Sequence, residues 1–152
     1  MSHTTTLKTI KIVDIEALED AVSFLAKEGV RVSFHKNTRP RMYYERQQVM
    51  CDYVVKIAGC PYDVGFEKQA DGSYAPIFDA WDGHIRQAIG AASGILGASV
   101  EEETMLNISR LVDLYGVHAA RNQLSKDGYG YGAEIYRCAE DNSYVLEVGA
   151  AY

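Results

Sequence analysis

Four aspartates and a histidine lie within the stretch YDVGFEKQADGSYAPIFDAWDGH, Tyr62–His84. Carboxylates that converge on one point, often with a histidine, can hold Mg²⁺ or Mn²⁺ for hydrolysis. Asp63, Asp79, Asp82 and His84 are the candidate members of such a cluster. Their spacing matches no metal-ligand motif, and alternation along a strand sends neighbouring side chains to opposite faces. A metal-assisted hydrolase that uses Asp79, Asp82 and His84 is therefore the alternative hypothesis and not the leading one.

The same stretch has a structural interpretation. Asp71-Gly72 is a strong turn pair between two β-rich runs, which predicts a hairpin. The letters DAWDGH are typical of a strand end, a turn and a helix capped by Asp82. We therefore expect the hairpin acids to be structural, and we expect no cofactor.

Basic and aromatic residues gather in the segment RPRMYYER, residues 39–46. Arginine can fork onto a phosphate and tyrosine can stack on a base. Pro40 stiffens the entry to the segment and biases the residue before it towards an extended shape. The candidate binding residues are Arg39, Arg41, Tyr43, Tyr44 and Arg46, with Arg31, Lys36 and Lys56 as further nearby cations. The alternative is a solvated loop whose charges pair with nearby acids.

Two further groups have a functional and a structural interpretation. The chain has 11 tyrosines, and the run YGYG at Tyr129–Gly132 fits either a recognition surface or ordinary strand composition. Tyr115 and His118 are neighbours on a predicted helix, near Arg110 and Arg121. His118 can act as an acid or base, but a histidine near an apolar helix face is more often a packing residue.

The bulk composition limits the class of protein. With 152 residues, 47% apolar residues and 24% charged residues, the chain is expected to form a single domain, 1–152. The formal charge of −6 disfavours diffuse binding to phosphate backbones and leaves room for a local basic patch. Three cysteines without a CxxC pair predict reduced thiols, and the start MSHTTTLKT and the absence of a long apolar run lead us to expect neither a signal peptide nor a membrane-spanning segment. These features predict a cytoplasmic protein with no membrane partner.

The hydrophobic pattern predicts the order of elements. A strand at about Thr5–Ile12, a helix capped by Asp14 and stopped by Gly29, and a short strand form a β-α-β unit. A strand at 51–59, the hairpin, a long helix at 100–128 with a kink at Gly116, and two closing strands about a turn at 141–143 follow. The expected core residues are Leu18, Val22, Leu25, Val112 and Tyr115. The pattern predicts an α+β fold with one antiparallel-rich sheet and two main helices, which a ferredoxin-like core with added strands would satisfy.

Several short motifs resemble those of a known family. They are the opening MSH-T, the hairpin YDVGFEKQADGSY and the closing NISRLVDLYGVHAARNQLSKDGYG. The chain resembles a family of unknown function found in cyanobacteria, plastid genomes and phages, which includes a plastid hypothetical open reading frame. The matching residues are Asp63, Gly65, Phe66, Asp71, Gly72 and Tyr74 in the hairpin, and Asn107, Arg110, Leu111, Tyr115 and His118 in the helix. The resemblance implies one compact domain, encoded by a bacterium or phage, and implies no activity.

The leading functional hypothesis is a non-catalytic binding protein. Its partner would be anionic (a nucleotide, a nucleic acid or an acidic protein) and would contact the basic aromatic segment. The metal-assisted hydrolase is the second hypothesis. A third is a structural accessory subunit that works within a homo-oligomer or a larger complex.

Overall fold

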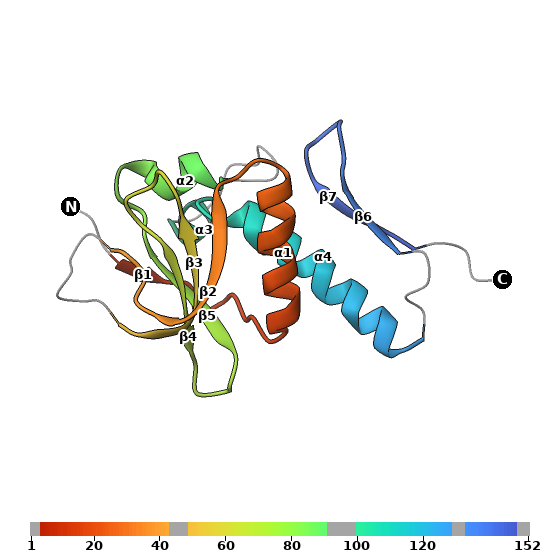
Figure 1. Ribbon diagram of the computed structural model, residues 1–152, viewed down its shortest axis with the longest axis horizontal. Helices are drawn as coiled ribbons and strands as arrows, with labels where there is room; N and C mark the ends of the chain where they lie inside the picture. Colours follow the sequence, from red (N-terminus) through yellow and green to blue (C-terminus); the bar gives the residue numbers. More distant parts are fainter. Residues whose placement is uncertain (1–3, 43–48, 91–99, 129–132, 149–152) are drawn as a thin grey trace.

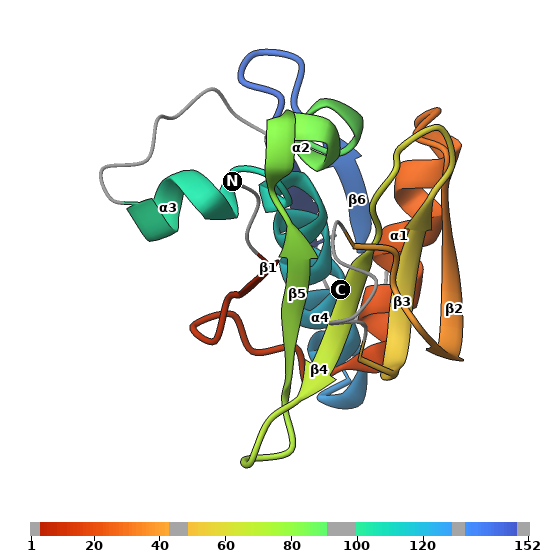
Figure 2. The same ribbon diagram turned by 90° about the vertical axis from the view of Figure 1, so that its left-hand side faces the viewer.

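The computed structural model describes residues 4–42, 49–90, 100–128 and 133–148. Five strands form one antiparallel sheet in the order β1-β5-β4-β3-β2 (Figure 2). Their bounds are β1 (Thr4–Thr6), β2 (Val32–Thr38), β3 (Cys51–Ile57), β4 (Val64–Lys68) and β5 (Tyr74–Asp79). The four strands from β2 to β5 form a simple meander, and β1 joins it beside β5.

This order confirms the α+β class and the antiparallel sheet, but it is not a ferredoxin-like core. In a ferredoxin-like fold two βαβ units interleave, so the first strand lies inside the sheet. Here β1 and β2 occupy opposite edges, and the β1-α1-β2 connection spans the whole sheet. The reason is the run of short hairpin connections after β2, which places each new strand beside the last one.

The first strand is shorter than the predicted Thr5–Ile12. Only Thr4–Thr6 pair with β5, and the chain turns at Lys8 and Thr9 before Ile12 makes an isolated bridge to Tyr74. Alternation of apolar and polar residues persists through the turn, because Leu7, Ile10 and Ile12 all point towards the core. The alternation alone therefore predicted one continuous strand.

Helix α1 (Ile15–Lys27) begins and ends as predicted. The carboxylate of Asp14 accepts the amide of Ala17 at 3.0 Å, and Gly29 follows the helix with a φ of 96°. Glycine tolerates that left-handed conformation, which a residue with a Cβ adopts at a cost. The predicted cap and stop are confirmed.

The predicted helix at 100–128 is two helices. Helix α3 (Val100–Met105) ends before a turn at 106–108, and α4 (Ser109–Lys126) then runs through Gly116 without a break. The side-chain amide of Asn107 donates to the carbonyl of Thr104 at 2.7 Å and so replaces a helical amide at the end of α3. The discontinuity therefore lies nine residues before the glycine where a kink was predicted.

One hydrophobic cluster connects the large sheet to the helices. Helices α1 and α4 cover the same face of the sheet (Figure 1). Leu18, Val22, Leu25 and Tyr115 are buried as predicted, whereas Val112 is partly buried and packs against the cluster. The opposite face of the sheet carries no helix among the described residues.

The closing strands form a second sheet and do not extend the first. Strands β6 (Glu134–Arg137) and β7 (Tyr144–Glu147) pair with each other on the far side of α4 (Figure 1). The predicted turn is confirmed, with the amide and hydroxyl of Ser143 both donating to Asp141. The expectation of one sheet was wrong because a strand pattern states which face is apolar and not which neighbour the strand meets.

Candidate functional site

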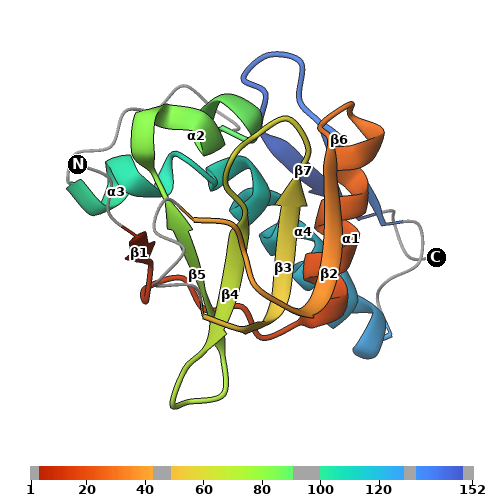
Figure 3. The same cartoon turned by 60° about the vertical axis from the view of Figure 1, so that its left-hand side comes forward.

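The basic segment crosses the sheet face that the helices leave open. Residues 39–42, which we call the strap, leave the end of β2 and pass over that face (Figure 3). Met42 is buried there in a small cluster with Cys51, Val54 and Ile77. Gly65 allows the close approach, since a Cβ at this position would lie 2.9 Å from a carbon of Pro40. The strap therefore packs against the face of the sheet and is not simply a solvated loop.

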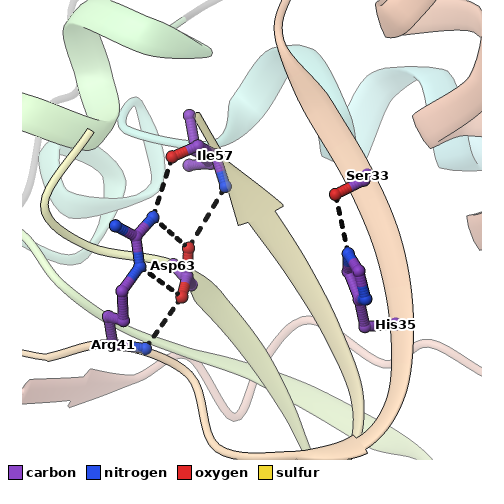
Figure 4. A network of polar contacts seen from close by, with 5 residues as sticks. All are labelled: Ser33, His35, Arg41, Ile57 and Asp63. Atoms are coloured by element: carbon purple, nitrogen blue, oxygen red, sulfur yellow. Dashed lines mark hydrogen bonds and ion pairs between the residues drawn. The ribbon is translucent and has the colours of Figure 1, made fainter. Parts of the chain in front are cut away.

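Arg41 fixes the strap through a buried carboxylate (Figure 4). Asp63 has no exposed surface, and one of its oxygens accepts the backbone amide and Nε of Arg41, each at 2.9 Å. The other oxygen accepts Arg41 Nη2 at 2.8 Å and the amide of Ile57 at 3.1 Å. These hydrogen bonds raise the pKa of Arg41 above its ordinary value. Arg41, predicted as a binding residue, thus forms the structural ion pair of the strap, and half of its side chain stays exposed.

Four other cations around β2 make no ion pair within the described residues. We call them the basic edge: Arg31, Lys36, Arg39 and Lys56. Arg31 precedes β2, Lys36 lies near its end, Arg39 follows it, and Lys56 lies on β3 opposite Ser33. In a chain of net charge −6, these four positive charges lie on or next to β2 and β3 without an ion pair among the described residues.

Two carboxylates close to the ends or the neighbour of β2 already have partners of their own. Asp52 on β3 accepts the hydroxyl of Tyr74 at 3.0 Å. Glu28, which precedes Arg31 by three residues, is held by Arg110 at 3.2 Å and by Arg137 at 3.7 Å. Among the described residues, neither carboxylate forms an ion pair with a cation of the basic edge.

A cleft of about 390 Å³ adjoins one end of the basic edge. It lies between the start of β2, the β3–β4 turn and helix α2 (His84–Ala88), and Arg31, Gly59, Cys60, His84 and Gln87 line it. A Cβ at residue 59 would lie 2.3 Å from the guanidinium of Arg31, so glycine leaves room for that side chain. The volume suits a small ligand or one side chain of a partner.

The structure does not bring together the Asp/His cluster of the alternative hypothesis. Among the described residues, no group of three His, Cys, Asp or Glu side chains lies close enough to hold a metal ion. Asp63 is buried against Arg41, and Asp79 is buried and accepts the amide of Trp81 at 2.9 Å. Asp82 lies 3.8 Å from His84 on the surface. The expected cap by Asp82 was wrong, because Asp82 has a φ of 54° and Gly83 takes the N-cap position of α2.

Tyr115 and His118 have packing and structural roles. The hydroxyl of Tyr115 accepts the amides of Val13 and Asp14 at 2.9 Å and 3.1 Å, which fixes the chain before α1. His118 is 3% exposed, and its Nδ1 lies 2.9 Å from the carbonyl of Leu114. Burial lowers the pKa of His118. The geometry agrees with the packing interpretation of His118.

One polar cluster was not predicted at all. Glu28 at the end of α1 accepts the hydroxyl of Tyr144 at 2.5 Å, and Arg110 donates to the same hydroxyl at 2.7 Å. Arg137 lies over the ring of Tyr144, 5.6 Å from its centroid. This cluster fastens the β6–β7 hairpin to α1 and α4. Its members are far apart in the sequence and share no motif, so only the fold reveals them.

The structure describes only part of the predicted binding group. Tyr43, Tyr44 and Arg46 lie outside the described residues, as does the run Tyr129–Gly132. Arg39 is exposed and Arg41 is bound to Asp63. The predicted group is therefore described only at its first two cations.

Comparison of the chain with protein-family models, curated proteins and solved structures finds no match. Among the described residues, no helix combines the length and the apolar character needed to cross a membrane.

Proposed function

We propose that this protein is a non-catalytic binding protein that holds an anionic partner on its basic edge. The observation that carries the proposal is the group of four cations around β2 that make no ion pair among the described residues. Exposed positive charge attracts anions, even on a chain whose net charge is negative. We include Tyr43, Tyr44 and Arg46 as further binding residues, because the sequence predicts this role for them.

The contacts of the strap support this choice of surface. Because Arg41 and Asp63 neutralise each other, the net charge of the strap comes from Arg39. Arg31 and Lys56 lie on β2 and β3 or next to them, where a sheet fixes their positions, and not on the strap alone. A rigid scaffold reduces the entropy that side chains lose when a partner binds.

The proposal extends to location and family. We assign the protein to the cytoplasm, since all three cysteines are free thiols and two of them are buried. Membership of the family found in cyanobacteria, plastid genomes and phages stays a prediction, as does a role within a homo-oligomer. A metal-assisted hydrolase is not favoured, because the described acids that could serve it are buried or apart.

A charge-matched pair of variants tests the proposal. One variant replaces Arg31, Arg39 and Lys56 with glutamine, and the control replaces Lys8, Lys68 and Lys126, which are also exposed and free of ion pairs in the described chain. Both lose three positive charges, so a general charge effect is the same in each. The probes are an acidic peptide, a single-stranded oligonucleotide and ATP, each titrated at low and at physiological salt.

We expect at least one probe to bind the native protein, more weakly as the salt concentration rises. The basic-edge variant should bind about tenfold or more weakly and lose most of that salt dependence, while the control changes by roughly twofold. Equal losses in both variants, or no binding of any probe, would contradict the proposal.

A further inference from the structure

The outer edge of β2 offers backbone groups as well as charge. β2 is the last strand on its side of the sheet, and no described strand pairs with its outer edge (Figure 2). An unpaired edge presents N–H and C=O groups that can template another strand. The register shows which residues these are.

Arg31 and Ala58 lie opposite each other, and the amide of Ala58 donates to the carbonyl of Arg31 at 2.9 Å. In an antiparallel pair, residues alternate between those that bond across the ladder and those that point away from it. Ser33 and His35 therefore bond to β3, whereas Phe34 and Lys36 direct their backbone groups outward. The amide of Ile57, opposite Val32, agrees with this alternation because it bonds to Asp63 and not to β2.

The basic edge is arranged along this free backbone. Arg31 and Arg39 flank the two ends of the strand, which are at most about 26 Å apart, the span of a fully extended chain. A compact anion can reach one end only, whereas an extended chain of similar length can reach both. Lys36 and Lys56 supply positive charge between the ends.

From this arrangement we propose that the partner is an extended acidic peptide segment, which adds to the sheet as a strand beside β2. Strand addition takes affinity from main-chain hydrogen bonds and specificity from side chains at alternate positions. A polypeptide offers the donors and acceptors that Phe34 and Lys36 require, while a phosphate backbone offers acceptors alone. This inference depends on the proposed function, because the basic edge supplies the attraction for the acidic side chains.

A second copy of this chain fits the outer edge of β2 less well than an acidic peptide does. When two β2 strands pair antiparallel over their full length, His35 faces itself and Arg31 lies opposite Arg39 of the other copy, at both ends. Like charges placed directly opposite each other destabilise a strand pair. An acidic segment places negative charge at the same positions.

The test uses a short fluorescent peptide of alternating glutamate and valine. Its control is the same peptide with every backbone amide methylated, which keeps the charge and removes the hydrogen-bond donors. On the protein, Lys36→Ala and Lys36→Pro lose the same charge, but only the proline also removes the outward amide. Proline is tolerated where an edge N–H faces solvent, so β2 should keep its pairing with β3.

We expect the peptide to bind the native protein. Lys36→Ala should lower the affinity about threefold relative to the native protein. Lys36→Pro should lower the affinity about tenfold relative to Lys36→Ala. The methylated peptide should bind poorly even to the native protein, and this comparison remains valid if Lys36→Pro does not fold. Equal affinity of the two peptides, or of the two folded variants, would overturn strand addition while the proposed function stands. An oligonucleotide that binds more tightly than the peptide, and equally to both variants, would also overturn it. If no anionic probe binds, the proposed function fails as well.

Discussion

Two arginines only ten positions apart, Arg31 and Arg41, have opposite roles. Arg41 is bound on one side by the fully buried carboxylate of Asp63, while Arg31 makes no ion pair among the described residues. Both are basic, exposed to solvent and close to β2. The difference is whether the fold supplies a counter-charge, and composition alone does not reveal this.

The largest expected difference between the two arginines is in stability. Arg41→Ala leaves the carboxylate of Asp63 buried with backbone donors only, and should lower the free energy of unfolding by roughly 3 kcal/mol. Arg31→Ala should change it by less than about 0.5 kcal/mol, since it is an exposed substitution. Urea denaturation of both variants measures the difference. Similar midpoints would show that the Arg41–Asp63 pair does not hold the strap.

The close approach of the strap can be tested without changing charge. A Cβ at Gly65 would lie 2.8 Å from the sulfur of Cys51 and 2.9 Å from Pro40, so Gly65→Ala should cost about 1–3 kcal/mol through overpacking. Gly116 in α4 has open space around it, and Gly116→Ala should instead stabilise the protein by about 0.5–1 kcal/mol. Thermal or urea denaturation measures both changes. A neutral Gly65→Ala would mean that the strap lies farther from the sheet.

The thiol beneath the strap reports whether the strap stays closed. Burial raises the pKa of Cys51 to about 11, and its side chain is 1% exposed. Because the thiolate is the reactive form, iodoacetamide at neutral pH should modify Cys51 much more slowly than the partly exposed Cys138. Mass spectrometry of the digested protein gives both rates. Arg41→Ala should increase the rate at which Cys51 is modified and leave the rate for Cys138 unchanged. An unchanged rate for Cys51 would show that Arg41 does not hold the strap in place.

The smallest expected effect is the pH dependence contributed by His118, on the helix side of the sheet. Burial lowers its pKa in the folded protein, so below about pH 6.5 the unfolded chain binds more protons than the folded one. Stability should therefore fall as the pH drops below that value. His118→Gln should flatten this part of the curve in urea midpoints measured across that range. An identical curve for the variant would assign the pH dependence to other groups.

Local patterns predicted the parts of the fold that local forces determine. The Asp14 cap, the Gly29 stop and the Asp71-Gly72 turn each depend on residues within a few positions, and all three are confirmed. The break between α3 and α4 and the separation of the β6–β7 hairpin depend on contacts between distant segments. Sequence periodicity carries no information about such contacts.

The candidate site shows the same division. The sequence shows where the cations are. It does not show which of them the fold pairs with a carboxylate. Asp63, Gly65, Arg110 and Tyr115 all form contacts between distant elements. Those contacts help to hold the fold together, whereas the cations of the basic edge make no ion pair among the described residues.

The most direct test of the central claim is an NMR titration of the ¹⁵N-labelled protein with the acidic peptide. The account predicts that amide signals of Arg31, Phe34, Lys36, Arg39 and Lys56 shift together, and that those of Lys8, Lys68 and Lys126 stay in place. Shifts confined to the second group, or spread evenly over all exposed cations, would contradict an anion-binding basic edge.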